Sequence, residues 1–231
     1  MKGGLLVILG ISVVAAEGMV PSIADTLVVR EWLLIGPFAV APREGITGVI
    51  EEPADFKPFA GESLRSSLVQ GGFAVCRRVG LDSAGWLNTD YPDVRWDSIQ
   101  DYYGVTGLLA TGFAYAEIEV PAACRALATT PKIGAFYLNG LGYPADVYGA
   151  GWLKIPVVLD SGKNRLLLVI QGYGDQRVRF RLEPVPAPVI IEHDCTVPDL
   201  VADQPLESWM GIPVANTLAE RITGLELDVR S

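Results

Sequence analysis

Cysteine, histidine and methionine are scarce in this chain. Its 231 residues include three cysteines, three methionines and a single histidine. The cysteines show no C-x-x-C spacing, which argues against a zinc or redox centre built on them. Their odd number leaves two arrangements open: one disulfide with one free thiol, or three buried thiols. The three cysteines are Cys76, Cys124 and Cys195.

Complete catalytic motifs are also missing. The string closest to a serine-hydrolase elbow, Gly80–Gly85, has one residue too many before its serine. His193 lies between Glu192 and Asp194, and neighbours on an extended chain point to opposite faces, so they predict neither a metal site nor a general base. Loop carboxylates are plentiful, but solvated acids are the default expectation in loops, and the sequence does not place two of them face to face as a glycosidase requires. The sequence therefore predicts no catalytic residue, no metal and no cofactor, and a structural calcium ion cannot be derived from it.

Positive charge is in short supply. There are 18 lysines and arginines against 27 aspartates and glutamates, which gives a formal net charge of −9. No run of five basic residues interrupts this acidic composition. Such a surface repels phosphate backbones, so nucleic acid is excluded as an expected partner.

A long hydrophobic run is absent as well, since a membrane helix needs about 20 apolar residues. The run Leu5–Val14 has the length of a signal-peptide core and precedes Ala15 and Ala16, so residues 1–16 are predicted to be a signal peptide cleaved before Glu17. The mature chain is then exported, periplasmic or extracellular, and free of the membrane. The alternative is a buried first strand.

Glycine and proline are abundant, at 25 and 16 residues, and they divide the chain into short elements. A helical pattern is confined to Ser63–Gln70 and Asn216–Arg221. Runs rich in valine, isoleucine, tyrosine and phenylalanine predict strands at a spacing typical of an all-β sandwich or jelly roll. The predicted strands are Leu27–Ile35, Gly112–Val120, Ile133–Leu138, Leu153–Leu159, Arg165–Ile170 and Arg177–Leu182.

Three short motifs follow one another along this part of the chain. They are Trp32–Phe38 (WLLIGPF), Tyr137–Gly140 (YLNG) and Leu159–Leu167 (LDSGKNRLL). In this order they resemble the galactose-binding-like β-sandwich modules that accompany catalytic domains of exported bacterial hydrolases. The resemblance covers about residues 26–183. It implies a β-sandwich over residues 17–183, and modules of this kind bind sugars, bind proteins or brace a neighbouring domain.

The character of the chain changes after residue 183. Pro184–Pro188 (PVPAP) is predicted to be a stiff linker. Residues 189–231 contain strand-like runs at Val189–Ile191 and Ile222–Val229 but no evident core pattern, and a segment this short does not easily build a core alone. We expect it to be the start of a second domain, in a fragment of a longer exported protein. The alternative is a C-terminal extension that folds back on the sandwich.

Aromatic and polar residues that could hold a sugar gather in two groups. Sugars are bound by aromatic faces and by side chains that reach their hydroxyls. Buried aromatics that pack the core are the competing interpretation, and Trp152, at a predicted strand start, is expected to be buried. If the first group is a recognition loop, Trp86 and Trp96 should be at least half exposed. The candidate ligand-binding residues are Trp86, Tyr91, Arg95, Trp96, Asp97 and Tyr102 in the first group, and Tyr143, Asp146 and Tyr148 in the second.

Two functional hypotheses therefore remain. The first is a non-catalytic accessory module that recognises carbohydrate. The alternative is a structural module that braces an esterase- or peptidase-like catalytic domain, absent from this chain and downstream of it. Exposed aromatic platforms favour the first function. Buried aromatics, together with apolar surface near the carboxyl end, favour the second.

Overall fold

The computed structural model describes residues 8–12, 20–40, 50, 52–53, 55–192, 194–196, 209–218, 220–223 and 225–230. His193 and most of the predicted signal peptide lie outside these residues. In the described part of the chain, no helix is long and apolar enough to cross a membrane.

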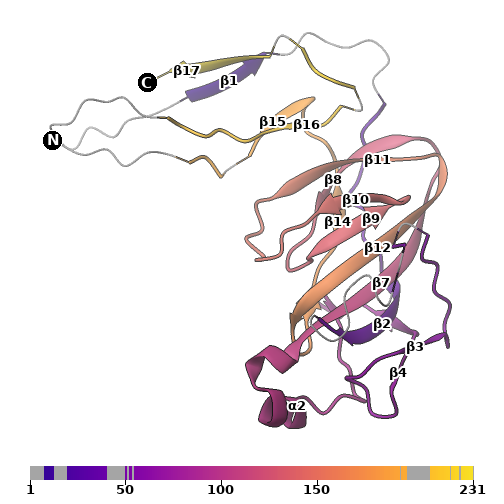
Figure 1. Cartoon of the computed structure of the whole chain (residues 1–231). Coiled ribbons are helices and arrows are strands. Elements are labelled where there is room, and N and C mark those ends of the chain that lie inside the picture. The colour runs from indigo at the N-terminus through magenta and orange to yellow at the C-terminus, as the bar shows by residue number, and fades with distance from the viewer. Residues whose placement is uncertain are drawn as a thin grey trace, which may run out of the picture.

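Two antiparallel sheets form the body of the molecule (Figure 1). The larger sheet has the strand order β10-β9-β12-β7-β2-β5 and the smaller has the order β11-β8-β14. The chain is thus an all-β sandwich, as the sequence predicts. The larger sheet consists of β10 (Leu141–Pro144), β9 (Ala135–Leu138), β12 (Gly162–Tyr173), β7 (Leu109–Val120), β2 (Glu31–Ala39) and β5 (Arg77–Gly80), and the smaller of β11 (Lys154–Leu159), β8 (Cys124–Thr129) and β14 (Arg181–Glu183).

The main core fills the space between the two sheets. Phe136 and Leu168 of the larger sheet and Ala126 of the smaller one are each at most 1% exposed. Strand β11 alternates between buried and half-buried residues, which is the pattern of a strand with one face on a core. Trp32 lies in the same core, and its indole N–H donates to the Val29 carbonyl over 3.1 Å.

A second, smaller core covers the outer face of the larger sheet. Ile35, Phe38 and Phe113 turn toward this side and are 1–2% exposed. The hairpin of β3 (Ser63–Arg65) and β4 (Phe73–Val75) packs there through Ala74. Strands β2 and β7 are buried on both faces for much of their length, so their sequences are nearly continuous apolar runs.

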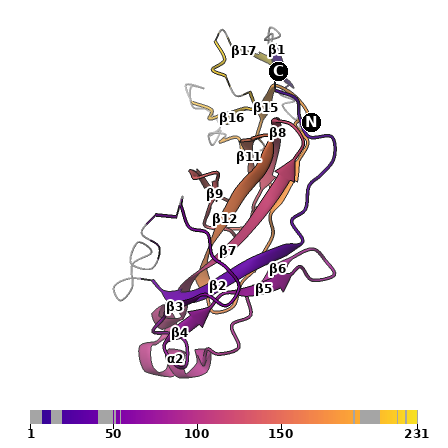
Figure 2. The same cartoon turned by 90° about the vertical axis from the view of Figure 1, so that its right-hand side faces the viewer.

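The helix α2 (Trp96–Tyr103) lies at the end of the molecule opposite the β1–β17 pair, and a 3-10 turn, η1 (Val105–Leu108), follows it (Figures 1 and 2). The sequence pattern did not predict this helix. Both segments with a helical pattern differ from expectation. Ser63–Gln70 begins as β3 and then turns, because Gly71 and Gly72 adopt positive φ and the Gly72 carbonyl accepts from Ser66 N–H. The described residues of 216–221 contain no helix.

The first motif forms an irregular stretch of β2. Gly36 has a φ of 141°, a conformation that favours glycine, and the Gly36–Pro37 peptide is cis. A β-carbon on Gly36 would lie 2.9 Å from the Gly112 Cα atom, so the close approach of β2 to β7 also requires glycine. The register between these strands shifts between Ile35 and Phe38, which directs the two side chains into the second core.

The segments outside the sandwich form two small strand pairs. Strand β15 (Val189–Ile191) pairs with β16 (Val214–Asn216), and β1 (Ile8–Ser12) pairs with β17 (Glu226–Arg230). Strand β1 falls within the predicted signal peptide. Its pairing with β17 is what the alternative interpretation of this segment, a first strand of the fold, would predict. The signal peptide and the domain boundary at residues 184–188 stay predictions.

The start of the C-terminal segment is fastened to the sandwich by Arg125, which is 5% exposed. Its guanidinium donates to the Val20 carbonyl over 2.5 Å and to the Thr217 carbonyl over 3.0 Å. The Thr217 hydroxyl in turn donates to the carbonyls of Ala187 and Pro188. Arg125, a buried cation in β8, therefore binds one segment that precedes the sandwich in the chain and one that follows it.

Candidate ligand-binding surfaces

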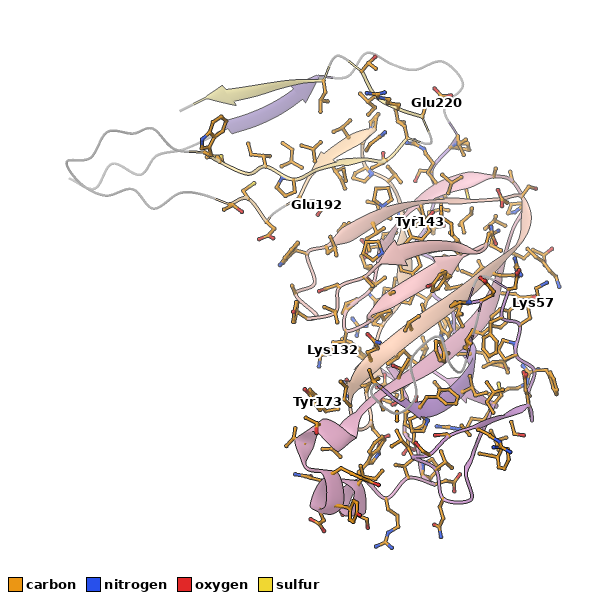
Figure 3. All side chains as sticks on the ribbon, in the orientation of Figure 1. Lys57, Lys132, Tyr143, Tyr173, Glu192 and Glu220 are labelled. Atoms are coloured by element: carbon orange, nitrogen blue, oxygen red, sulfur yellow. The ribbon has the colours of Figure 1, made fainter. Side chains whose placement is uncertain are left out.

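A groove of about 490 Å³ opens on the outer face of the larger sheet. Strands β2, β5 and β7 form its floor, and the loop 57–60 forms one wall. Figure 3 places Lys57, from this wall, beside β7 and β12 on the side of the sandwich away from Lys132. Concave surfaces of this size are the usual location of small-molecule sites. The groove is lined by Glu31, Trp32, Leu33, Lys57, Pro58, Phe59, Ala60, Arg78, Tyr115, Ala116 and Glu117.

Two ion pairs lie along the groove. Arg78 lies 2.5 Å from Glu31, and Lys163 lies 3.2 Å from Glu117. All four side chains are at least 45% exposed, and exposed ion pairs contribute up to about 1 kcal/mol each. Pairs this weak can reopen, which makes their oxygens and N–H groups available to the hydroxyls of a ligand.

Tyr115 and Glu117 form a polar pair on β7. The Tyr115 hydroxyl donates to Glu117 over 3.1 Å. The Lys163 bond, followed by this Tyr115 bond, lowers the pKa of Glu117 below its usual range. Burial, reinforced by Glu117, raises the pKa of Tyr115 to about 12. At neutral pH the pair therefore presents a carboxylate and a neutral phenol.

Phe59 supplies the apolar contact of the groove. Its side chain is 65% exposed, although its backbone is held by a hydrogen bond from Phe59 N–H to the Glu62 carboxylate over 3.2 Å. The adjoining backbone is tied to β4 and β5, because Gly61 N–H donates to the Cys76 carbonyl. An exposed phenyl ring on an anchored loop loses little freedom when it contacts a ligand.

The first group of sequence-predicted residues lies elsewhere and is mostly packed. Trp86 and Trp96 are both partly buried, so the expectation that they are at least half exposed is wrong. Trp96 begins α2 and packs against the main core, with its ring edge-on to that of Tyr91, which is 7% exposed. Burial raises the pKa of Tyr91 above its ordinary range. Trp96 therefore helps to close the end of the sandwich, whereas Tyr91 also lines a smaller pocket of about 140 Å³ together with Arg77 and Asp93.

The remaining members of the first group are on the surface of α2. Arg95 and Asp97 are exposed at the start of the helix. Tyr102 is 79% exposed, and its ring stands edge-on to that of Tyr103 at 4.5 Å. Such an edge-on pair is not a flat stacking platform. The structure thus separates this group into buried and exposed halves.

The second group divides in the same way. Tyr143 on β10 stacks on Phe136 with ring centroids 4.9 Å apart, so one of its faces is used for packing. Asp146 is 5% exposed and accepts hydrogen bonds from Ala150 N–H and Gly151 N–H over 2.9 and 2.7 Å. Its carboxylate therefore fixes a loop and is not presented to a ligand.

The aromatic residues carried by that loop are exposed. Tyr148 is 91% exposed. Trp152 is 37% exposed and precedes β11, which begins at Lys154, so its predicted burial in a strand is wrong. None of the nine predicted residues lines the groove as the structure describes it. The sequence feature that could have indicated the groove is the segment Phe56–Phe59, in which two aromatic residues flank a lysine and a proline.

A second polar surface surrounds Trp86 on the outer side of the smaller sheet. Asp82 holds the turn before β6 (Leu87–Asn88) by accepting from Trp86 N–H over 2.9 Å, and it receives Arg177 over 2.8 Å. The backbone bond from Trp86, followed by the Arg177 bond, lowers the pKa of Asp82 to about 2. The guanidinium of Arg179 lies 3.9 Å from the centroid of the Trp86 ring. The sequence analysis assigned Arg179 to a strand and missed this role.

The three cysteines are free thiols, which decides between the two arrangements left open by the sequence. Cys76 and Cys124 are buried and Cys195 is partly buried. Burial, more than the nearby charge of Glu62, raises the pKa of Cys76 to about 11, which keeps it protonated at neutral pH. A protonated buried thiol is a poor nucleophile, so Cys76 is a packing residue.

The described residues contain no cluster of three or more side chains suited to hold a metal ion. Their fold and surfaces define a β-sandwich with an open groove of about 490 Å³, a smaller pocket of about 140 Å³ and an arginine-rich face. Comparison of the chain with protein-family models, curated proteins and solved structures found no match. The functional argument therefore rests on the chemistry of these surfaces.

Proposed function

We propose that this chain is a non-catalytic recognition module that binds carbohydrate in the groove on the outer face of the larger sheet. The observation that carries the proposal is the combination of the exposed Phe59 ring with two reopenable ion pairs over one concave floor. A phenyl ring covers the C–H face of a sugar, while carboxylates and cationic groups bind its hydroxyls.

The fold-level resemblance supports the same proposal. The three motifs typical of galactose-binding-like modules fall on β2, on the β9–β10 turn and on the start of β12, which are framework positions. Fold alone does not assign a ligand, so the groove carries the argument. We further propose export of the chain, in line with its predicted signal peptide.

The test is isothermal titration calorimetry with neutral oligosaccharides of glucose, xylose, mannose and galactose. We expect one series to bind with a dissociation constant on the order of micromolar to millimolar. Phe59→Ala should weaken that binding by about tenfold or more, because it removes the stacking surface. The melting temperature should change little, since the ring is 65% exposed.

Tyr148→Ala is the matched control. It also removes an exposed aromatic ring, but from a loop that does not line the groove, so it should leave affinity unchanged. If Tyr148→Ala or Tyr102→Ala abolishes binding and Phe59→Ala does not, the site is one of the aromatic groups predicted from the sequence. If none of the four series binds at millimolar concentration, the carbohydrate proposal fails.

A bracing function is the second candidate, and one observation favours it. Apolar side chains are exposed on the described C-terminal segment: Trp209 is 95%, Met210 is 40% and Leu225 is 43% exposed. Exposed apolar groups gathered on one segment are typical of a surface that another domain covers. Attachment of a downstream catalytic domain would then bury Trp209, which a blue shift of tryptophan fluorescence would report.

A further inference from the structure

Three arginines occupy alternate positions in the segment that leads from β13 (Arg177–Val178) into β14, the edge strand of the smaller sheet. They are Arg177 in β13, Arg179, and Arg181 at the start of β14. The residues between them, Val178 and Phe180, are at most 5% exposed and point into the core. Because side chains alternate across a strand, all three guanidinium groups emerge on the same outer face.

The three guanidinium groups converge on the turn at residues 82–86. Arg177 binds the Asp82 carboxylate, and Arg179 donates to the Ala84 carbonyl over 3.0 Å. An Arg181 terminal nitrogen lies 3.7 Å from the position of a β-carbon on Gly85. Stacking on the Trp86 ring fixes the plane of the Arg179 group.

The charges in this cluster are not balanced by the described residues around it. Asp82 is the one carboxylate that pairs with any of the three arginines there. The neighbouring cations contribute, after burial, to lowering the pKa of Arg179. The Nε atoms of Arg179 and Arg181 are buried, and neither has an acceptor among the described residues. Buried donors without acceptors cost free energy, so the cluster as described has unused hydrogen-bonding capacity. Because the two Nε atoms are closed to solvent, an external acceptor reaches them only when the guanidinium groups turn outward.

We propose that the face formed by Arg177, Arg179 and Arg181 is an anion site that binds the carboxylate of a small acid, such as a uronic acid. Guanidinium groups bind a planar carboxylate through parallel N–H···O bonds, and the fixed plane of Arg179 prepares that geometry. The site is independent of the groove, which lies on the outer face of the other sheet.

The balance of charge favours a small ligand over a polymer of acidic groups. Three arginines and one aspartate leave a local excess of positive charge on a chain whose net charge is −9. A long polyanion would be repelled by the surrounding surface, whereas a single carboxylate contacts the cationic face alone. A sugar acid and a simple organic acid share this chemistry, so the experiment separates them.

The test titrates the full chain with glucuronate, acetate and glucose, by calorimetry and by tryptophan fluorescence, since Trp86 lies beside the site. Arg181→Gln should weaken glucuronate binding by about tenfold. It should leave the melting temperature unchanged or raise it, because it removes like-charge repulsion and no bond that the structure describes.

Asp82→Asn should tighten binding, since it removes the competing carboxylate. Arg95→Gln, which replaces an exposed arginine immediately before α2, is the control and should change neither quantity.

Binding of glucuronate but not acetate identifies an acidic sugar as the ligand. Equal binding of both identifies any small carboxylate and leaves the site in place. The proposal is overturned if no carboxylate binds the wild-type chain or raises its melting temperature. It is also overturned if Arg181→Gln leaves the affinity for glucuronate unchanged, and a melting temperature lowered by several degrees in that variant would then show that the cluster is a structural brace. The neutral oligosaccharide that binds the groove should bind the wild type and Arg181→Gln equally, so failure of the anion site is separate from failure of the groove.

Discussion

At the scale of individual residues, the second and third motifs meet in a network of hydrogen bonds around two asparagines. Asn164 is fully buried, and its amide N–H group donates to the carbonyls of Asp160 and Gly162. Its side-chain oxygen accepts from Asp160 N–H and from the side chain of Asn139, each over 2.8 Å. Asn139 adopts a φ of 52° in the β9–β10 turn. The motif asparagines therefore tie two turns together, which explains their place in the pattern without a ligand.

Replacing Asn164 should accordingly destabilise the sandwich. We expect Asn164→Ala to lower the free energy of unfolding by about 2–4 kcal/mol, because it leaves buried backbone groups of the turn without partners. Chemical denaturation with urea measures this loss. Lys163→Ala, which removes one exposed ion pair, should cost less than about 1 kcal/mol. Similar losses in both variants would show that the asparagine contact contributes little.

At the scale of elements, the contact between β8 and the C-terminal segment depends on Thr217. This residue is 2% exposed, and its hydroxyl joins Arg125 to the end of the proline segment. Thr217→Val keeps the shape of the side chain but removes these hydrogen bonds. We expect faster hydrogen exchange in β15 and β16, with a loss of about 1–3 kcal/mol of local stability.

The matched control for this element is Thr196→Val, on the same segment but outside the Arg125 contact. It should leave exchange in β15 and β16 near the wild-type rate. Unchanged exchange in Thr217→Val would mean that the segment is held by its strand pairing alone. The rate of protease cleavage after residue 188 is a second measure of how firmly the C-terminal segment is held on the sandwich.

The elements that could be predicted from the sequence are those with strong local patterns. Strands β7, β11 and β12 carry branched and aromatic residues, and the predicted bounds overlap the observed ones. Strand β8 (CRALAT) was missed because alanine and arginine carry no strand preference, and its place is decided by pairing with β11 on one side and β14 on the other.

The candidate sites were harder to predict for a related reason. Side chains of Glu31, Phe59, Arg78 and Glu117 come from four separate segments, and only the pairing of β2 with β5 and β7 brings them to one groove. Dense local groups of aromatic residues were more visible in the sequence. In the folded chain Trp96 of one such group packs against the core at the end of the sandwich, because a large ring is most stable where it excludes water.

At the scale of the whole molecule, export can be tested directly. If residues 1–16 are a signal peptide, amino-terminal sequencing of the secreted protein should begin near Glu17. Processing would also remove β1 and leave β17 without its present partner. Recovery of chains that retain Met1 from the soluble cytoplasmic fraction of the native host would contradict export and favour the paired first strand.

The strand order of the larger sheet also governs how fast the molecule reaches its native state. Strand β2 pairs with β7, with Leu33 opposite Tyr115, and β7 then pairs with β12, with Val120 opposite Gly162. These partners are distant along the chain, so a large loop entropy must be overcome before the central contacts form. Folding is therefore expected on a timescale of about milliseconds to seconds, not microseconds. Until these pairings form, the apolar strand β2 lacks its partner β7, which lies much later in the sequence.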